Sequence, residues 1–314
     1  MKILFTGASS FTGFWFIKEL AAAGHEVTAV FRKMPDEYSD DIRRSRVERL
    51  LPICRPIYGC SFGDDNFLKL IGEGKWDLFC AHGADVTNYN SPDFDVTTAL
   101  ANNTYHLPLV YDGLIKSGCN KVIITGSVFE NDEGAGDKDL KAFSPYGLSK
   151  SFTWQIYRYH AAAKQIGLGK FVIPNPFGPY EERRYTRYLL KNWFARATAV
   201  VNTPAYVRDN IHVSLLAKQY VEFATLSNSG GCSYLNPSGY VETQGAFTQR
   251  VAREMRDRLC LECNFELKHQ VEFKEPYVRI NTDPIAARLD WKEKLAWDEM
   301  AAYYEGQWAL GRLS

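Results

Sequence analysis

The first half of the chain alternates between short apolar runs and longer segments whose apolar residues recur with helical spacing. Residues 2–6 and 26–31 are apolar runs typical of buried parallel strands, and residues 14–23 between them have a helical pattern that Gly24 ends. The same alternation continues to about residue 175. This order predicts an α/β fold with a doubly wound parallel sheet.

The pattern is less regular in the second half of the chain. Helices are expected over residues 181–196 and from about 244 to 259, and a glycine-containing loop over residues 130–141. Residues 34–49 form a charged stretch that is expected to be helical and exposed. We predict a first domain over residues 1–175 and a smaller mixed α/β lobe over residues 176–314.

A glycine-containing turn joins the first strand to the first helix. In a strand–turn–helix–strand unit of about thirty residues, such a turn can hold a dinucleotide pyrophosphate at the helix N-terminus. Gly7 would permit the sharp turn, and Gly13 would let the helix approach the strand. Ser10 stands where the usual pattern has its middle glycine, so a purely structural turn is the alternative.

Tyr146 and Lys150 are four residues apart, a spacing that places both on one face of a helix. Ser144 suits the N-cap of that helix and Pro145 its first position. A nearby ammonium favours the phenolate and lowers the tyrosine pKa from about 10. The pair could therefore act as an acid/base near neutral pH, and an ordinary solvated helix face is the alternative.

Composition and charge narrow the class of protein. Hydrophobic residues make up 46% of the 314 residues, charged residues 24%, and the formal net charge is zero, which argues against nucleic acid as a partner. No apolar run reaches the roughly 18 residues of a membrane span, and no signal peptide is expected, because Met1 and Lys2 lead directly into an apolar run typical of a core strand. Seven cysteines fit reduced thiols, so a cytoplasmic protein is expected. The pair Cys260 and Cys263 has no second pair at zinc-site spacing, and no metal site is predicted.

The chain resembles the extended short-chain dehydrogenase/reductase family of NAD-dependent epimerases and dehydratases, whose members largely modify nucleotide sugars. Besides the glycine turn and the Tyr146–Lys150 pair, the resemblance lies in residues 77–84, Asn103, and residues 121–129, 175–179 and 208–213. It implies a Rossmann domain, and a substrate-binding lobe that is assembled from discontinuous segments. It also implies a homodimer formed by the helix after Asn103 and the helix that carries Tyr146, which has Phe152, Ile156, Tyr157 and Tyr159 on it.

The resemblance assigns roles to residues of this chain. Tyr146 would be the acid/base, Lys150 would bind the nicotinamide ribose, and Thr125 would hold the substrate oxygen, with Ser127 as the competing hydroxyl. Arg208 would hold the substrate diphosphate, with Arg279 as a second clamp or, alternatively, a surface ion pair. Asn175 would anchor the sugar or the loop on the nicotinamide side. The predicted cofactor-binding residues are Gly7, Ser9, Ser10, Phe11, Thr12, Gly13, Arg32, Cys60, Ser61, Gly83, Ala84, Asn103, Tyr146, Lys150 and Pro174.

The residue that follows the second predicted strand indicates whether the cofactor is NAD or NADP. An acidic residue there would accept hydrogen bonds from the adenosine ribose, whereas Arg32 can pair with a 2′-phosphate. This favours NADP over NAD, and an ordinary surface charge is the alternative. Cys60 replaces an aspartate that relatives often carry near the adenine.

The residues after Thr125 bear on the reaction. Dehydratases of the family carry an Asp-Glu pair there, and this chain has Gly126 and Ser127, so a 4,6-dehydratase is not expected. Thr125, Tyr146 and Lys150 suffice for a 4-epimerase or a 4-ketoreductase. The alternatives are a non-catalytic NAD(P)-binding regulator and a reductase of a non-nucleotide carbonyl. Arg208 argues against the latter, although Ser214 stands where relatives have an aspartate.

Three histidines are expected to have structural rather than catalytic roles. His212 is expected to be a packed residue rather than a base. His82 and His106 have no identifiable partner in the sequence, so buried or capping roles are expected for both.

Overall fold

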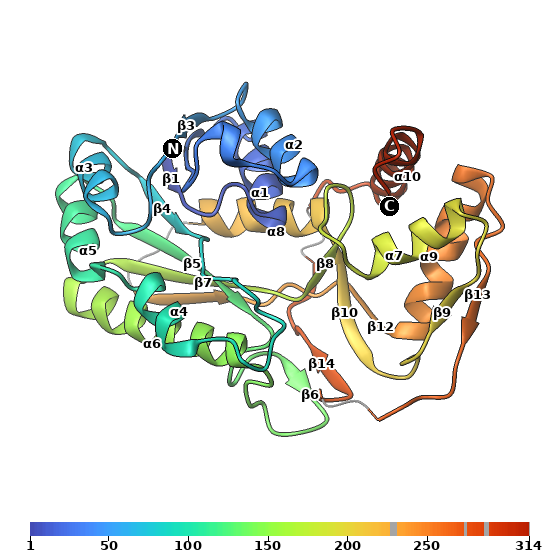
Figure 1. Cartoon of the computed structure of the whole chain (residues 1–314). Helices are drawn as coiled ribbons and strands as arrows, with labels where there is room; N and C mark the ends of the chain where they lie inside the picture. The colour runs from blue at the N-terminus through green and yellow to red at the C-terminus, as the bar shows by residue number, and fades with distance from the viewer. Residues whose placement is uncertain (227–230, 273–274, 286–288, 314) are drawn as a thin grey trace. The chain divides into compact units, whose positions relative to one another are not determined.

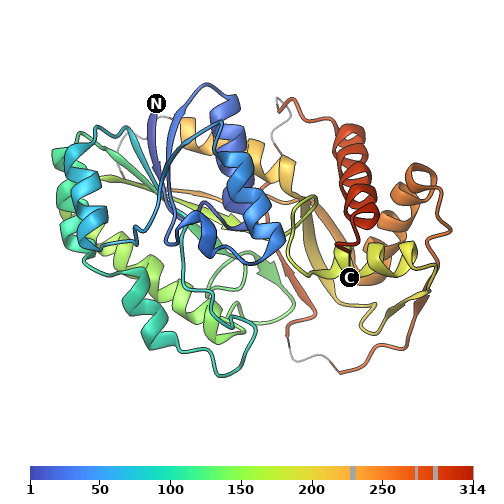
Figure 2. The same ribbon diagram turned by 45° about the horizontal axis from the view of Figure 1, so that its top comes forward.

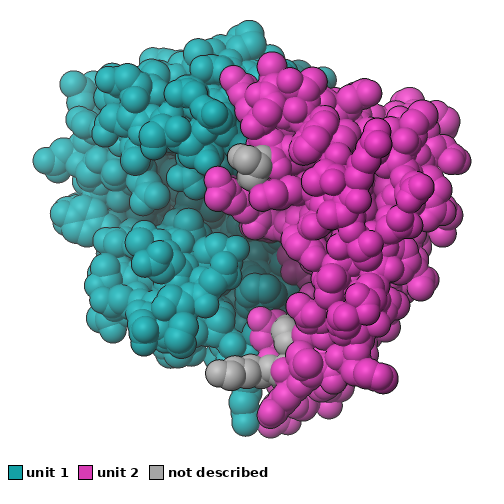
Figure 3. Space-filling model, turned by 45° about the vertical axis from the view of Figure 1, so that its right-hand side comes forward, with its two compact units in different colours: residues 1–133, 140–173, 217–236 teal, residues 134–139, 174–216, 237–314 magenta. Residues whose placement is uncertain are grey.

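A computed structural model describes residues 1–226, 231–272, 275–285 and 289–313. The chain forms two compact units, coloured separately in Figure 3, whose segments alternate along the sequence. Unit 1 contains residues 1–133, 140–173 and 217–236, and unit 2 contains residues 134–139, 174–216 and 237–314.

Unit 1 is built on a seven-stranded sheet with the order β11-β7-β5-β4-β1-β2-β3. All of its strand pairs are parallel, which confirms the predicted doubly wound fold. The strands are β1 (Lys2–Phe5), β2 (Glu26–Val30), β3 (Arg55–Ile57), β4 (Leu78–Ala81), β5 (Lys121–Ser127), β7 (Gly167–Ile173) and β11 (Cys232–Leu235).

Helices cover both faces of this sheet (Figures 1 and 2). One face carries α3 (Asp65–Glu73), α4 (Val96–Asn103), α5 (Leu107–Lys116) and α6 (Pro145–Lys164). The other carries α1 (Phe11–Ala22), α2 (Asp41–Leu50) and α8 (Val213–Thr225). An aromatic stack closes the second face, because the rings of Phe16 in α1 and Tyr220 in α8 are parallel at 4.0 Å, with Phe171 of β7 edge-on to Tyr220 at 5.0 Å.

Several predicted boundaries shift in unit 1. Helix α1 begins at Phe11 instead of residue 14, because the Ser10 side chain caps it by accepting a hydrogen bond from the amide of Gly13. The expected exposed helix over residues 34–49 is a short 3₁₀ turn, η1 (Pro35–Glu37), followed by α2, which Asp40 caps.

Unit 2 is a smaller mixed α/β unit. Its main sheet has the order β12-β10-β14-β6, with β8 paired to β10, and a two-stranded sheet joins β9 to β13. The elements are β6 (Ala135–Gly136), β8 (Asn175–Phe177), α7 (Tyr185–Phe194), β9 (Ala199–Val201), β10 (Val207–His212), β12 (Tyr240–Thr243), α9 (Gln244–Leu259), β13 (Phe265–Leu267), β14 (Val278–Ile280) and α10 (Glu293–Ala309). The predicted helix over residues 244–259 is confirmed, and the loop expected at residues 130–141 contains the short strand β6.

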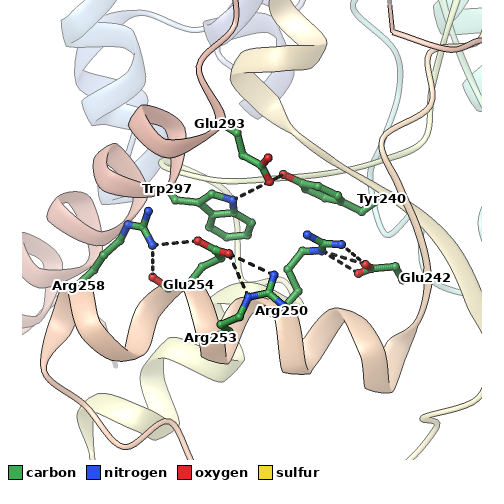
Figure 4. A network of polar contacts seen from close by, with 8 residues as sticks. All are labelled: Tyr240, Glu242, Arg250, Arg253, Glu254, Arg258, Glu293 and Trp297. Atoms are coloured by element: carbon green, nitrogen blue, oxygen red, sulfur yellow. Dashed lines mark hydrogen bonds and ion pairs between the residues drawn. The ribbon is translucent and has the colours of Figure 1, made fainter.

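Polar side chains tie α9, α10 and β12 together in unit 2 (Figure 4). Arg258 in the last turn of α9 donates to Glu254 (2.9 Å) and to Asp298 of α10 (2.7 Å). Glu293 in the first turn of α10 accepts a hydrogen bond from the hydroxyl of Tyr240 in β12. These contacts orient the helices over a buried apolar cluster that includes Trp193, Phe247 and Trp297.

No described helix is both long enough and apolar enough to cross a membrane.

Candidate active site

The glycine turn forms a cradle of bare backbone in unit 1. Gly7 has a φ of +76°, and a Cβ there would lie 2.7 Å from the amide nitrogen of Gly83. A Cβ on Gly13 would lie 2.3 Å from the carbonyl oxygen of Gly7. Neither position tolerates a side chain, because the backbone of Gly83 and of the turn itself fills the space, and the turn leads directly into the N-terminus of α1. The positive end of the α1 dipole at a glycine turn fits the pyrophosphate of a dinucleotide.

The loop after β4 closes one side of the glycine turn. Gly83 donates its amide to the hydroxyl of Thr6 at 3.1 Å. The buried side chain of Asn103 accepts a hydrogen bond from the amide of Asp85 (2.8 Å), and its amide group lies 3.4 Å from the Thr153 hydroxyl of α6. Asn103 thus ties this loop to α6, and its direct contact with a cofactor remains a prediction.

The residues predicted near the adenosine lie beyond β2 and β3. Arg32 is exposed. Burial acts to raise the pKa of Asp85, but hydrogen bonds from Thr87 and Asn102 and the charge of Arg32 outweigh it and lower that pKa. Cys60 is buried, and burial followed by the charge of Asp64 raises the pKa of its thiol to about 12, so it stays neutral.

Helix α6 places Lys150 under the end of β5. Ser144 caps the helix by accepting from the amide of Gly147 at 3.0 Å, and Pro145 is its first residue, as predicted. Lys150 is 4% exposed, and its Nζ donates to the carbonyl oxygen of Thr125 at 2.6 Å. Burial lowers the pKa of Lys150, the charge of Glu130 opposes that shift, and the charge of Lys170 adds to it.

Tyr146 lies half-buried in the first turn of α6, with aromatic neighbours. Its ring is edge-on to Tyr89 (5.5 Å) and to Phe94 (6.0 Å), both from the segment between β4 and α4. A Cβ on the adjacent Gly147 would lie 2.2 Å from the carbonyl oxygen of Phe129, two residues past the end of β5. The first turn of α6 therefore packs directly against the segment that leaves β5.

Two hydroxyl side chains lie among the last three residues of β5, and their surroundings differ. Thr125 is buried, and its Oγ1 lies 2.8 Å from Nδ1 of His82. Ser127 is partly exposed, and its Oγ accepts a hydrogen bond from the amide of Phe129 at 3.2 Å. Within the described ranges no group accepts a hydrogen bond from the Ser127 hydroxyl. The sequence predicts both hydroxyls at this strand end and favours Thr125 as the one that holds the substrate oxygen.

His82 lies at the centre of this edge, within the residues 77–84 that carry part of the family resemblance, but the sequence indicated no partner for its ring. Its Nε2 lies 3.1 Å from the hydroxyls of both Ser10 and Thr12, opposite the Thr125 contact. Burial, and then the charge of Lys150, lower the pKa of His82 to about 3, so the ring is neutral at physiological pH. Its partners lie some seventy and forty residues away in sequence, on other elements, so only the parallel arrangement of β1, β4 and β5 reveals them.

A buried cluster of charged side chains contacts the same end of β5. Lys170 of β7 donates to Glu130 at 2.6 Å and also pairs with Glu133, and all three side chains are at most 10% exposed. Glu130 additionally accepts the amide of Ser127 at 2.7 Å. The side chain of Lys170 lies 5.0 Å from the ring of Trp154. Glu130 is thus committed to structural contacts.

The predicted substrate residues lie in unit 2. Arg208 of β10 and Arg279 of β14 are register partners in a parallel pair, so both side chains leave the same face of the sheet. They are 4% and 1% exposed. Further along the same edge of β10, Asn175 of β8 pairs with Asn210.

Arg208 has local anionic and carbonyl partners. Its Nη2 donates to the carboxylate of Glu275 at 2.8 Å, and its Nη1 donates to the carbonyl oxygens of Val207 and Pro276 at 2.8 and 2.9 Å. The guanidinium also lies 4.7 Å from the ring of Tyr206. A diphosphate at this arginine would therefore compete with the partly exposed Glu275 carboxylate.

His212 has the packed position that was expected, whereas His106 is exposed and its side chain does not cap α5. His106 precedes α5 and its Nδ1 donates to the carbonyl oxygen of Gly63 at 3.0 Å. His212 is buried, with Nδ1 2.8 Å from the Ser214 hydroxyl and its ring edge-on to Phe177 at 5.3 Å.

Comparison with known proteins agrees with this architecture. The profile of the NAD dependent epimerase/dehydratase family matches residues 3–234. No curated protein sequence matches the chain. Among solved structures, UDP-glucose 4-epimerase from Bifidobacterium longum in complex with NAD+ and UDP is 20% identical with a TM-score of 0.71, and the alignment covers 100% of both chains.

Two further epimerase structures are similar over nearly the whole chain. UDP-glucuronic acid 4-epimerase from Bacillus cereus, in complex with UDP-glucuronic acid and NAD, is 15% identical, with 98% of this chain and 99% of that chain covered and a TM-score of 0.73. UDP-glucose 4-epimerase from Thermotoga maritima with UDP-glucose is 14% identical, with 98% and 100% covered and a TM-score of 0.73. At these identities the likeness establishes the fold alone.

We predict that Lys170→Met strongly destabilises the protein, because it leaves the buried carboxylates of Glu130 and Glu133 without their cation. Breaking a buried ion pair from one side costs about 3–5 kcal/mol, and the free energy of unfolding from urea titration measures this loss. Lys69→Met, which removes an exposed pair with Glu73, is the control and should change that free energy within experimental error. A Lys170→Met variant as stable as the parent would contradict the prediction.

Proposed function

The chain belongs to the NAD dependent epimerase/dehydratase family, and on that premise we propose that it modifies a nucleotide-activated sugar by hydride transfer at a ring carbon. The reaction would be a 4-epimerisation or a 4-keto reduction, with Tyr146 as acid/base. The observation that carries the proposal is the Lys150 Nζ–Thr125 oxygen hydrogen bond at 2.6 Å. It joins the Tyr146–Lys150 helix to the end of β5, on the same sheet as the glycine cradle.

The cofactor would lie over the glycine turn. Gly7 and Gly13 let the turn pack closely against Gly83 and the start of α1, and the N-terminus of α1 would stabilise the charge of a pyrophosphate. A bound nicotinamide supplies the hydride acceptor or donor. Lys150 donates one N–H to the Thr125 carbonyl oxygen, which leaves its other N–H groups to bind ribose hydroxyls. Its positive charge would act on the Tyr146 phenol.

Tyr146 would move the proton. In the oxidative direction its phenolate takes the proton of the C4 hydroxyl while the C4 hydrogen leaves as hydride, and in the reductive direction the phenol returns a proton to that oxygen. The Lys150 ammonium favours the phenolate. The Tyr89 and Phe94 rings restrict where the phenol can point, since both pack against its edge or face.

Unit 2 would supply the nucleotide-binding groups. Arg208 and Arg279 emerge side by side on one face, and two guanidinium forks suit the oxygens of a diphosphate. The structures named above contain UDP or UDP-sugars, which supports this class of ligand for the fold. Asn175 remains our proposed sugar anchor.

A dehydration is disfavoured by the residues around β5. Gly126 and Ser127 carry no carboxylate, and Glu130 is held by Lys170 and by the Ser127 amide. A non-catalytic NAD(P)-binding regulator and a reductase of a non-nucleotide carbonyl are the alternatives. The buried Lys150 beside Thr125 disfavours the first, and the paired arginines disfavour the second.

A homodimer also remains a proposal. On α6, Phe152 and Tyr159 are 44% and 71% exposed, and on α5 Leu109 is 51% exposed, which is apolar surface that a second subunit would bury. Tyr157 is only 3% exposed, so it belongs to the core of unit 1 and is withdrawn from the proposed contact.

Tyr146→Phe should lower turnover by about 10²–10⁴-fold while cofactor affinity changes little, because only the proton-transferring oxygen is lost. Turnover of UDP-, GDP-, dTDP- and CDP-sugars, with and without NADPH, measures the first effect, and fluorescence titration with the dinucleotide measures the second. Tyr159→Phe, on the exposed face of the same helix, is the control. Full activity of Tyr146→Phe would reject the site.

Arg208→Lys should raise the KM for a nucleotide sugar by about tenfold with a smaller change in kcat, because an ammonium cannot make the bidentate contact. Steady-state kinetics measure KM and kcat separately. Arg250→Lys, in the Arg250–Glu242 pair of unit 2, should leave the KM near the parental value. Equal KM values for Arg208→Lys and the parent would remove Arg208 from the substrate site.

Arg32→Ala should weaken binding of NADP(H) by about 10–10²-fold relative to NAD(H), since loss of a charge-assisted hydrogen bond to a 2′-phosphate costs about 1.5–3 kcal/mol. Dissociation constants for both dinucleotides test this, with Lys33→Ala as the neighbouring exposed control. If the parent binds NAD at least as tightly as NADP, the preference for NADP is wrong.

Identifying the cofactor released from the denatured protein separates the two reactions. Retained NAD+ with sugar interconversion and no net redox would favour the epimerase. NADPH consumption by protein purified without dinucleotide would favour the ketoreductase.

A further inference from the structure

His82 connects the glycine turn to β5 through both of its ring nitrogens. Nε2 faces the hydroxyls of Ser10 and Thr12, and Nδ1 faces the hydroxyl of Thr125 at 2.8 Å. Its ring packs against Phe5 and Phe16, with centroid distances of 5.5 and 5.2 Å. The imidazole is therefore held in one orientation, with a defined neighbour at each nitrogen.

Ser10 determines which nitrogen carries the proton. Its Oγ lies 2.8 Å from the carbonyl oxygen of Gly7, and a carbonyl can only accept, so the single hydroxyl hydrogen of Ser10 is committed to Gly7. The Oγ of Ser10 must then accept from His82, which places the ring hydrogen on Nε2. A neutral ring of this tautomer has a bare Nδ1, so Nδ1 accepts the hydroxyl hydrogen of Thr125.

The opposite tautomer loses a contact. With the hydrogen on Nδ1, the Nε2 lone pair would face the Ser10 oxygen at 3.1 Å without a hydrogen between them. Only Thr12 could then donate to Nε2. In the Nε2–H tautomer, by contrast, the ring N–H faces both hydroxyl oxygens and each can accept from it. The hydrogen-bond network therefore favours the Nε2–H tautomer.

We propose that His82 is a positioning residue that accepts a hydrogen bond from the Thr125 hydroxyl, so that Thr125 has no hydrogen left to donate to a substrate and Ser127 is the β5 hydroxyl that donates to the substrate oxygen. Ser127 lies two residues further along the same strand, so its side chain leaves the same face as that of Thr125. Its hydroxyl is partly exposed, and its hydrogen has no acceptor among the residues that the structure describes.

The chemistry requires a donor at this position. When a ketone oxygen gains negative charge, hydrogen-bond donors stabilise it and acceptors do not. Tyr146 would supply one donor, and a Thr125 hydroxyl committed to His82 cannot supply a second. This inference rests on the proposed function, and it reverses the preference for Thr125 over Ser127 that the sequence suggested.

Nitrogen NMR tests the tautomer without any assay of activity. Protein labelled with ¹⁵N-histidine should show His82 as the neutral Nε2–H form at pH 7, with the signal assigned by its loss in His82→Gln. Ser10→Ala should make the Nδ1–H form detectable, because it removes the oxygen that opposes the Nε2 lone pair. Thr12→Val, the matched control, should leave the parental tautomer in place. A dominant Nδ1–H form in the parent would overturn the proposal.

Kinetics test the consequence for catalysis. Ser127→Ala should lower kcat by about 10²–10³-fold, as for loss of one donor to a developing oxyanion, whereas Thr125→Val should lower it by less than about tenfold. Thr125→Ser, which keeps the hydroxyl, checks for effects of side-chain shape, and circular dichroism confirms that each variant folds. A hundredfold loss in Thr125→Val, or near-parental kcat in Ser127→Ala, would overturn the proposal. Either result, with Tyr146→Phe inactive, would leave the proposed function standing, and an active Tyr146→Phe would reject that function itself.

Discussion

The buried ammonium of Lys150 is the constraint around which the candidate active site is organised. Burying a cation is costly unless hydrogen bonds and opposite charge compensate it. The Thr125 carbonyl supplies the hydrogen bond, and the charge of Glu130 acts on Lys150 in the compensating direction. Glu130 is in turn held by Lys170 and the Ser127 amide. Each buried charge at the end of β5 thus depends on the next.

The parallel sheet brings the other parts of this site to the same edge. The carboxyl ends of neighbouring parallel strands lie together, so the turn after β1, the His82 segment after β4 and the hydroxyls of β5 become neighbours. His82 converts this adjacency into specific hydrogen bonds. Because its low pKa keeps the ring neutral, His82 can orient hydroxyl groups without adding a second cation beside Lys150.

Unit 2 contains buried positive charges that would be compensated by an anion. Two arginines on adjacent strands are buried side by side, and Arg208 already contacts the carboxylate of Glu275. Like charges placed this closely favour an anionic partner. A substrate diphosphate would serve as one, provided that it outcompetes the more exposed Glu275.

The sequence alone determined the fold class, because strand and helix periodicities are local properties and the alternation of apolar runs is regular through residue 175. It also located the glycine turn and the Tyr146–Lys150 pair, since both depend on spacing within one turn or one helix. It failed where partners lie on different elements. His82, the Glu130–Lys170–Glu133 cluster and the distinct surroundings of Thr125 and Ser127 follow from hydrogen bonds between distant segments. Such contacts leave no periodic signal in the chain, and only the tertiary structure decided them, because each nitrogen, ammonium or carboxylate takes its role from the groups that folding places within hydrogen-bond distance.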